Sequence, residues 1–210
     1  MRRTPIAFLV LIFCFLGGCS SEAPQPAATP AVKEAPKQET ATGRVAFQKF
    51  YQTARLWSAD ARCFRLESDI TKESPGRDGK SGVWRAYFAS LTRNSSKQFV
   101  WSGLTADDAP SRGIAPVGAD QAFSAANQST QPFDITFLKV DSDRALEVAQ
   151  KHGGEAILKK NPDQPVRYIL NWNPKKSQLE WHVVYGAAEL DAKLNVAVNA
   201  STGEFERVEK

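Results

Sequence analysis

Three cysteines carry the most reactive side chains of this 210-residue chain, and Cys19 stands in the most informative context. A cysteine thiol can form a disulfide, bind a metal, act as a nucleophile or accept a covalent modification. Upstream of Cys19 lie the cationic pair Arg2-Arg3 and an apolar run from Ile6 to Leu16, about eleven residues long. This run is too short to cross a bilayer, which takes about 20 residues. Together with its basic start, it is typical of a secretory signal peptide.

The four residues Leu16-Gly17-Gly18-Cys19 resemble the lipobox of bacterial lipoproteins. The resemblance implies that residues 1–18 are a signal peptide, that a diacylglyceryl group is attached to the Cys19 sulfur, and that the new amino terminus is acylated. Because two or more acyl chains hold a protein firmly, Cys19 is predicted to be the contact with the membrane. An ordinary signal peptide or an uncleaved anchor is the alternative. Ser20 stands where an aspartate would favour the inner membrane, so we expect the outer membrane, facing the periplasm, with surface display left open.

Cys63 is the one cysteine that this processing leaves unmodified, because Cys14 departs with the signal peptide. A lone thiol cannot close an intramolecular disulfide, so the core itself must hold the domain together. Cys63 lies in the stretch ARCFRLES beside Phe64 and Leu66. We interpret it as a small apolar core residue, with a reactive or intermolecular thiol as the alternative.

Other patterns for catalysis or metal binding are weak. The two histidines are His152, expected near a helix C-terminus, and His182, expected on the polar side of a strand. A metal site built on both would need carboxylates from loops that the sequence does not place. The segment SPGRDGKSG at 74–82 lacks the first glycine of a phosphate-binding loop and precedes a strand-like run, so a hairpin loop is expected. The sequence therefore predicts no catalytic residue, no metal and no cofactor.

The charge balance gives little support for nucleic-acid binding. The formal net charge is +4, and removal of Arg2 and Arg3 with the signal peptide lowers it by two, to +2. The longest lysine runs are pairs at 159–160 and 175–176, whereas a nucleic-acid footprint usually needs a basic stripe. We expect no nucleic-acid partner.

The chain divides into a linker and a folded part in which one order of elements occurs twice. Residues 19–43 contain the lipidated cysteine and a proline-rich segment without aromatic side chains, which is predicted to be disordered. Each half of the folded part, 44–130 and 131–210, begins with a helix and continues with about three strands. Residues 105–131 are rich in small and polar residues and are expected to be a long connection. The first helix is predicted from apolar residues at helical spacing, namely Phe47, Phe50, Tyr51, Ala54 and Trp57.

The second half supplies the clearest strand pattern. Its helix is expected to start with Asp141 or Ser142 as the cap and to end at Gly153. Three strands follow, in which every second residue is apolar. The apolar positions are Val166, Tyr168, Leu170 and Trp172 in the first strand, Leu179, Trp181, Val183 and Tyr185 in the second, and Leu194, Val196 and Val198 in the third. We therefore predict an α+β fold of two helix-plus-three-strand units, each an antiparallel sheet packed by a helix (PepSY/cystatin-like).

The C-terminal half, 131–210, resembles a PepSY domain, a small module first described in peptidase propeptides. The resemblance is carried by DSDRALEVAQKHGG, by the strands around Trp172 and Trp181, and by LNVAVNASTGEFERV, in which Asn199 stands where the family usually has aspartate. It implies a helix against a small antiparallel sheet, no catalytic residue, and regulation of a peptidase by docking. The N-terminal half, 44–130, is interpreted as a diverged copy. Thr202-Gly203 is predicted to form the tight turn of a terminal hairpin.

Four tryptophans on predicted strands are the candidates for ligand binding: Trp84, Trp101, Trp172 and Trp181. At least two of the chain's tryptophans are expected in the core. Two others side by side on an open sheet face would form a platform for a peptide or a sugar ring. The alternative is that all are buried or half-buried.

The leading hypothesis is a non-enzymatic, lipid-anchored envelope protein that binds a protein or peptide, with a peptidase as the partner that the resemblance implies. One rival is an envelope hydrolase that acts on a polymer, which would need an acid/base pair in a cleft, such as two carboxylates or His182 with a carboxylate. Another rival is a structural assembly lipoprotein without a pocket.

Overall fold

The computed structural model describes residues 37–209, so the predicted signal peptide, Cys19 and most of the predicted linker lie outside the described residues. The described helices are α1 (Gly43–Trp57), α2 (Ser142–Ala149) and α3 (Glu155–Lys160), with a π-helical turn, η3 (Gln150–Gly154), between α2 and α3. Short 3-10 turns lie at η1 (Gln128–Thr130) and η2 (Ile135–Phe137). The strands are β1 (Arg62–Asp69), β2 (Val83–Ser90), β3 (Ser95–Ser102), β4 (Gly113–Ala122), β5 (Val166–Asn173), β6 (Gln178–Tyr185), β7 (Asn195–Asn199) and β8 (Phe205–Glu209).

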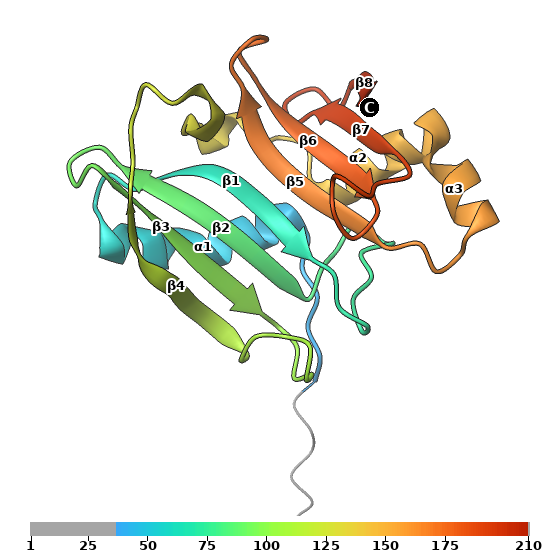
Figure 1. Cartoon of the computed structure of the whole chain (residues 1–210), viewed down its shortest axis with the longest axis horizontal. Coiled ribbons are helices and arrows are strands. Elements are labelled where there is room, and N and C mark those ends of the chain that lie inside the picture. The colour runs from blue at the N-terminus through green and yellow to red at the C-terminus, as the bar shows by residue number, and fades with distance from the viewer. Residues whose placement is uncertain (1–36, 210) are drawn as a thin grey trace, which may run out of the picture. The chain divides into compact units, whose positions relative to one another are not determined.

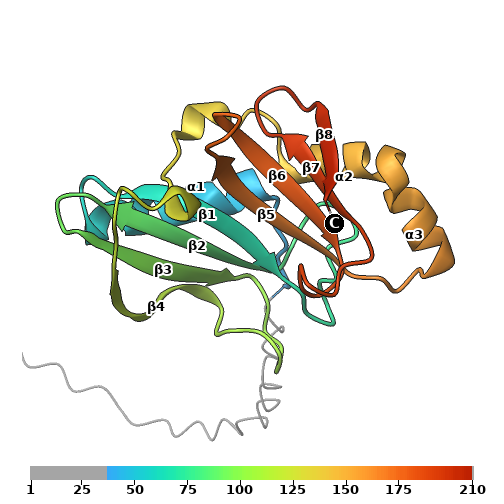
Figure 2. The same cartoon turned by 45° about the horizontal axis from the view of Figure 1, so that its top comes forward.

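All eight strands belong to one antiparallel sheet in the order β4-β3-β2-β1-β5-β6-β7-β8. The helices lie on one face of this sheet, α1 behind the N-terminal strands and α2 behind the C-terminal ones (Figure 1). A turned view shows how strongly the sheet twists between its two halves (Figure 2). The halves join where Arg65–Glu67 of β1 pairs with Ile169–Asn171 of β5, a contact of three residue pairs.

The predicted fold class, two separate helix-plus-three-strand units, is wrong. The sheet dominates the fold and runs without interruption through both halves, because β1 and β5 pair with each other. Each half also has a fourth strand, and β4 lies in the segment 105–131 that was expected to be a connection. β4 is an edge strand whose residues are exposed or half-exposed along its whole length, so it shows no apolar alternation.

Most of the individual elements do match the sequence pattern. Helix α1 buries Phe47, Phe50 and Ala54, as its spacing predicts, although Tyr51 of the same set is 44% exposed. The three C-terminal strands direct the predicted apolar residues into the core. Gly203 has φ 80° in the turn between β7 and β8, as predicted for the terminal hairpin. The alternation succeeded because one face of each strand packs under helix while the other carries mostly polar residues, with buried Ile169, Val184 and Ala197 as exceptions.

The centre of the core is an aromatic cluster that connects the two halves. Trp84 of β2 and Trp181 of β6 are fully buried, with ring centroids 6.4 Å apart in an edge-to-face arrangement. Each indole N–H donates to a backbone carbonyl, Trp84 to Ala41 and Trp181 to Val140, both at 2.9 Å. These carbonyls lie just before α1 and α2, so the two indoles tie both helix starts to the sheet.

The N-termini of α1 and α2 meet at Asp141 and Ser142. The Asp141 carboxylate accepts the backbone N–H of Ser142 at 2.7 Å, which caps its own helix as predicted, and also that of Arg44 in α1 at 2.8 Å. It accepts the Thr42 hydroxyl at 2.6 Å as well. The Ser142 Oγ accepts the N–H of Gly43 at 2.8 Å. One Asp-Ser pair therefore satisfies backbone donors of two helices at once.

The loop between β1 and β2, residues 70–82, is packed against this junction. The Ser142 hydroxyl donates to the Gly79 carbonyl at 2.6 Å, and the Gly79 N–H donates to the Tyr168 hydroxyl at 3.1 Å. The Tyr168 hydroxyl in turn donates to the Gly76 carbonyl. Gly79 has φ +82°, and a Cβ there would lie 2.2 Å from Asp143 Cα, so no larger residue fits without movement. The loop that superficially resembles a phosphate-binding loop therefore has a structural role, because its backbone is hydrogen-bonded to Ser142 and Tyr168.

Replacing Asp141 by alanine is expected to lower the free energy of unfolding by about 2 kcal/mol, since the change removes cap bonds from both α1 and α2. Chemical denaturation with urea measures this loss. The control is Glu147→Ala, because Glu147 is an exposed residue of α2 whose ion-pair partner is Arg144, also exposed. We expect Glu147→Ala to change the free energy of unfolding by less than about 0.5 kcal/mol. An equal effect of both variants would contradict a shared cap.

A charged candidate site on the helix-free face of the sheet

The tryptophans proposed as a binding platform lie mostly inside the core. Trp84 and Trp181 are fully buried and Trp101 is 4% exposed. These three cannot form a surface platform, which corrects the hypothesis that placed them among the ligand-binding candidates. Trp172 is half-buried, contacts Phe137 edge-to-face with ring centroids 5.3 Å apart, and lines a surface hollow. Of the four candidates, only Trp172 borders a site.

Cys63 is a core residue, as the sequence predicts. Its side chain is 2% exposed, and its thiol donates to the Arg65 carbonyl at 3.2 Å. Burial raises the pKa of the Cys63 thiol, so the reactive thiolate is disfavoured at neutral pH. Cys19, the predicted site of lipid attachment, lies outside the described residues.

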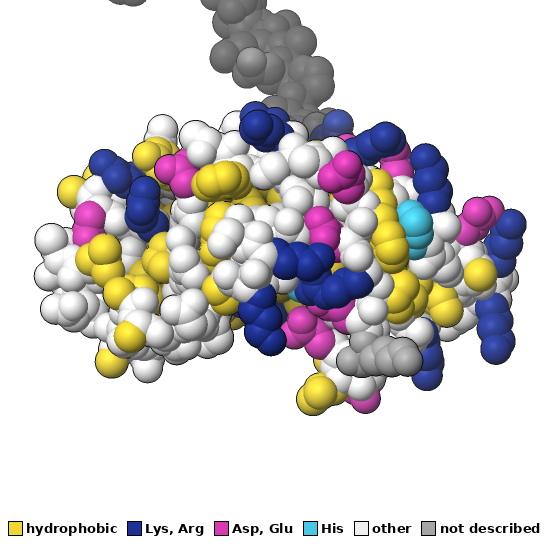
Figure 3. All heavy atoms as spheres, turned by 90° about the horizontal axis from the view of Figure 1, so that it is seen from above, with side chains coloured by type: hydrophobic (Ala, Val, Ile, Leu, Met, Phe, Trp, Pro, Cys, Tyr) yellow, Lys and Arg dark blue, Asp and Glu magenta, His cyan; other side chains and the backbone are white. Residues whose placement is uncertain are grey.

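The face of the sheet opposite the helices carries charged side chains at alternate strand positions. Figure 3 shows basic and acidic side chains gathered next to one another at the middle of one view of the surface. On β1 the Glu67 carboxylate, 5% exposed, accepts Arg65 Nε at 2.7 Å and lies 3.1 Å from the Arg167 guanidinium of β5. The Tyr87 hydroxyl donates to it at 2.8 Å. Burial by itself would raise the pKa of Glu67, but the two arginines outweigh burial, so its pKa is lowered.

A second buried carboxylate, Glu180 of β6, is fully enclosed. Its two oxygens accept Arg207 Nη1 and Nη2, each at 2.9 Å, in a bidentate pair. The side-chain amides of Asn173 and Gln178 donate to it at 3.0 and 2.7 Å. Burial raises the pKa of Glu180, while Arg207 and the amides lower it, and the net pKa is below the ordinary value. The charge is stable because four N–H donors replace the lost water.

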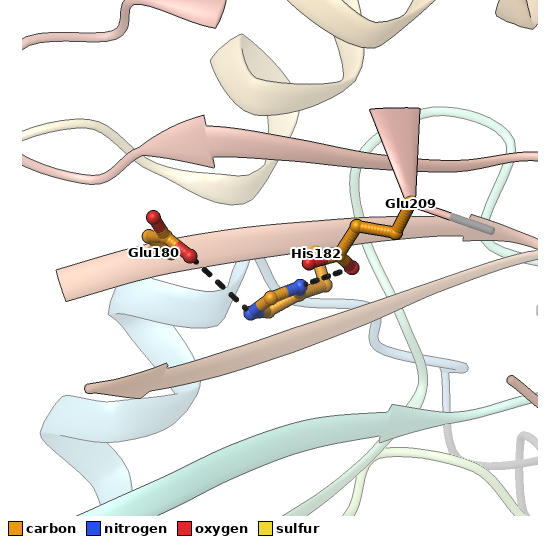
Figure 4. A group of neighbouring side chains, drawn as sticks. All are labelled: Glu180, His182 and Glu209. Carbon is orange, nitrogen blue, oxygen red and sulfur yellow. Dashed lines mark hydrogen bonds and ion pairs between the residues drawn. The ribbon is translucent and has the colours of Figure 1, made fainter. Parts of the chain in front are cut away.

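His182 lies two residues along β6, on the same face as Glu180, as its alternation predicts. Its Nδ1 is 2.8 Å from Glu209 Oε2 on β8, and its Nε2 is 4.0 Å from Glu180 Oε2 (Figure 4). Arg207 also donates to Glu209. Burial raises the pKa of Glu209, but the hydrogen bond from His182 and the charge of Arg207 together lower it. The side chain of His182 is 12% exposed, so little of the ring reaches solvent.

These charged groups border a surface hollow of about 400 Å³ at β5 and β6. Gln128 and Ser129 of η1 form part of its rim. Its lining residues are Arg65, Gln128, Ser129, Asn171, Trp172, Asn173, Pro174, Glu180, His182 and Arg207. The hollow therefore combines guanidinium, amide, imidazole and carboxylate groups with two apolar residues, Trp172 and Pro174.

The arrangement does not suit a metal ion, although ligand atoms of Glu180, His182 and Glu209 lie within 4.8 Å of one another. Both Glu180 oxygens already accept Arg207, and the other Glu209 oxygen accepts it too. A cation placed there would have to displace the guanidinium from three hydrogen bonds and would meet its positive charge.

Proton transfer is the chemistry that this geometry comes nearest to. A carboxylate that holds the Nδ1 side of a histidine is the arrangement of many general bases. In this site, however, no hydroxyl or thiol of the described residues hydrogen-bonds to His182. The Ser129 hydroxyl at the rim donates to Asn127 Oδ1 at 2.7 Å instead. Among residues 37–209, the hollow thus holds a histidine–carboxylate pair to which no hydroxyl or thiol is hydrogen-bonded.

Of this site, the sequence predicts the polar placement of His182, which the hydrolase hypothesis pairs with a carboxylate, and nothing of the other charged residues. Glu67, Glu180 and Arg207 occupy strand positions that alternate with apolar ones, which normally indicates a solvated face. The same alternation could have signalled an ion network, because opposite charges recur on adjacent strands: Arg65 and Glu67 on β1, Arg207 and Glu209 on β8. Which of them face each other depends on the strand order.

Comparisons with known proteins add little. No protein-family model matches the chain, and no curated protein matches it, so the PepSY resemblance gains no support there. Among solved structures, the chain is similar to a "putative lipoprotein" from Clostridium difficile 630, with 12% sequence identity and a TM-score of 0.47. That match covers 78% of this chain and 91% of the other. A likeness this distant carries no argument about function. Within residues 37–209, no helix is long and apolar enough to cross a membrane.

Arg207→Ala is expected to lower the free energy of unfolding at pH 7 by about 2 kcal/mol, because Glu180 keeps its charge but loses its guanidinium. The loss should shrink at acid pH. In the wild type the pKa of Glu180 is lowered, so its stabilising charge is fully present above the ordinary pKa of a glutamate and is lost as the pH falls through the lowered pKa. In the variant, burial still raises the pKa of Glu180, but Arg207 no longer lowers it. Protonation of Glu180 at acid pH then removes the cost of burying an unpaired charge.

Urea unfolding of both proteins at pH 7 and pH 4 measures this change. Arg62→Ala serves as the control, since Arg62 is an exposed residue that lies 3.6 Å from an exposed Asp134. A difference between wild type and Arg207→Ala that is the same at both pH values would show that Glu180 is not the group responsible.

Proposed function

We propose that this protein is a lipid-anchored protein of the bacterial envelope that binds a protein or peptide partner through the helix-free face of its sheet and performs no chemistry on it. Two independent features support the proposal. One is the Leu16-Gly17-Gly18-Cys19 stretch after a short apolar run. The other is the hollow lined by paired arginines and carboxylates.

The anchor follows from the sequence near Cys19. Lipid on this cysteine would hold the chain at a membrane, and each buried methylene group contributes about 0.8 kcal/mol. With Ser20 after the cysteine, the expected location is the outer membrane, facing the periplasm. The proline-rich residues after it would let the folded part, which begins near Ala41, reach a partner at some distance from the lipid.

We assign the binding role to the hollow because of the groups that line it. Surfaces that bind a partner combine fixed polar groups with an apolar wall, and this hollow offers Arg65 and Asn171 beside Trp172 and Pro174. The sheet edges are weaker candidates. On β4, Pro116 lacks an N–H and Gly118 has φ 64°, features that prevent a regular added strand, and β8 has only five residues.

An envelope hydrolase is the second candidate, because His182 and Glu209 meet at 2.8 Å beside the hollow. This is the histidine–carboxylate pair that the hydrolase hypothesis requires. Against it stand the low exposure of His182 and the position of Glu180, which lies 4.0 Å from the Nε2 atom that would have to accept a proton. The binding role needs no such access. A purely structural assembly role is less well supported, since it would not need the hollow.

The anchor can be tested with radiolabelled palmitate in cells that produce the protein. We expect label in the wild-type protein and none in Cys19→Ala, since the thiol is the attachment point. Cys63→Ala is the matched control and should incorporate label normally, because Cys63 is buried in the core. Equal labelling of the wild type and Cys19→Ala would refute the anchor.

The partner can be sought by placing a photo-crosslinking amino acid at Ser129, an exposed residue on the rim of the hollow. The control position is Leu56 of α1, which is 89% exposed on the helix-bearing side. Irradiation of intact envelopes should give a defined protein adduct at 129 and not at 56. A peptidase recovered at high stoichiometry would match the partner that the PepSY resemblance implies. Glycan adducts alone, with polymer cleavage that His182→Asn abolishes, would replace the binding role with the hydrolase.

A further inference from the structure

Three side chains form a row across three adjacent strands at the floor of the hollow. Arg65 of β1 faces Asn171 of β5, and Asn171 faces Glu180 of β6 in the sheet register. Neighbouring strands lie about 4.8 Å apart, so the row spans roughly 10 Å. All three line the hollow, together with His182 and Arg207.

The row presents N–H donors that the protein itself does not use. The Asn171 side chain makes no hydrogen bond to any residue in the range 37–209. Arg65 donates through Nε to Glu67, while its Nη2 lies 3.5 Å from Glu189, a residue about half exposed. Arg207 has five N–H donors, of which three are engaged by Glu180 and Glu209. A ligand would therefore meet free donors on Arg65, Asn171 and Arg207.

Each of the two arginines at the site is paired with two carboxylates, Arg65 with Glu67 and Glu189 and Arg207 with Glu180 and Glu209. Glu180 is fully buried, and both its oxygens accept hydrogen bonds from within the protein. Glu180 therefore has no oxygen left for a ligand, whereas Arg65 and the Asn171 amide keep N–H donors that are not engaged within residues 37–209, and the Asn171 amide also offers an acceptor oxygen. A carboxylate is the chemical complement, because its two oxygens match the planar fork of a guanidinium.

The apolar residues of the lining restrict the kind of ligand to which the carboxylate can belong. Trp172 and Pro174 border the donors, so the ligand must have an apolar part next to its charged part. A space of about 400 Å³ accepts one or two amino-acid residues rather than a folded surface. The last residue of an extended peptide meets this requirement, because its carboxylate and its side chain are attached to the same Cα atom.

We propose that the hollow binds the C-terminal carboxylate of an extended peptide, with Arg65 and Asn171 donating to its oxygens and Trp172 and Pro174 contacting the last side chain. This inference rests on the proposed binding role and narrows it to one kind of ligand. Arg207 keeps its hydrogen bonds to Glu180 and Glu209, and these two carboxylates balance its charge.

The test uses the full chain in detergent and the peptide acetyl-Ala-Ala-Ala-Leu with a free C-terminal carboxylate. Titration is followed by NMR through the Asn171 side-chain amide and the Trp172 indole signals. We expect both signals to shift, and the same peptide with a C-terminal amide to bind at least tenfold more weakly. Acetate and N-acetylmuramate, tested alone, distinguish a peptide terminus from a small or sugar-borne acid.

Asn171→Ala is the decisive variant, because removal of this unpaired amide should leave the folded protein intact. We expect it to weaken the acid peptide about fivefold without a change in the thermal unfolding midpoint. Arg65→Lys should weaken binding about tenfold, since lysine keeps the charge but loses the planar fork. Gln121→Ala on the exposed edge strand β4 is the control and should have no effect.

Equal binding of the acid and amide peptides, or shifts confined to residues elsewhere, would overturn the proposal. So would the absence of any shift at millimolar peptide, or tighter binding of N-acetylmuramate than of the peptide. If a protein crosslinks at position 129 but the acid peptide does not bind, the partner-binding role stands and only the proposed recognition of a C-terminal carboxylate is refuted. Failure of both experiments would remove the partner-binding role as well.

Discussion

The fold depends on one interaction at its centre, where Asp141 and Ser142 satisfy the backbone donors of two helix N-termini. Asp141 bonds to N–H groups of α1 and α2, and Ser142 links the start of α1 to the Gly79 loop. The pairing of β1 with β5 spans three residue pairs, and beyond them the Tyr168 N–H donates to the Ser68 hydroxyl at 2.9 Å. On the helix-bearing side of the sheet, the Asp141–Ser142 junction and the buried indoles of Trp84 and Trp181 connect the two halves as well.

The continuity of the sheet has a consequence for its other face. Strands from both halves lie side by side there, and charged residues that are far apart in the sequence become neighbours. Glu67 lies between arginines of β1 and β5, and Glu180 receives Arg207 from β8. Each carboxylate is nearly or fully buried, and each stays charged because guanidinium groups replace water around it. Every carboxylate of this network has at least one guanidinium or amide donor, as buried polar groups require.

The proposed role is recognition rather than catalysis, and the spare donors of the lining are the feature that favours it. His182 and Glu209 have the contact that a general base would use, yet the ring is nearly enclosed and faces Glu180 on its other side. Free N–H groups on Arg65 and Asn171, by contrast, need only a complementary group to approach them. The anchor predicted at Cys19 is a separate property of the sequence, and it concerns where the protein works rather than what it binds.

The sequence by itself determined the local features: the apolar face of α1, the alternation in β5, β6 and β7, the cap at Asp141, the buried state of Cys63 and the polar placement of His182. These follow from spacing and residue type over short stretches. It missed β4, because an exposed edge strand has no apolar period, it wrongly separated the halves, and it did not decide which of the tryptophans are buried. The tertiary structure alone decided that β1 pairs with β5, and with that pairing which charges meet. Strand order is a long-range property, and residues separated by about a hundred positions, such as Glu67 and Arg167, carry no local signal of their contact.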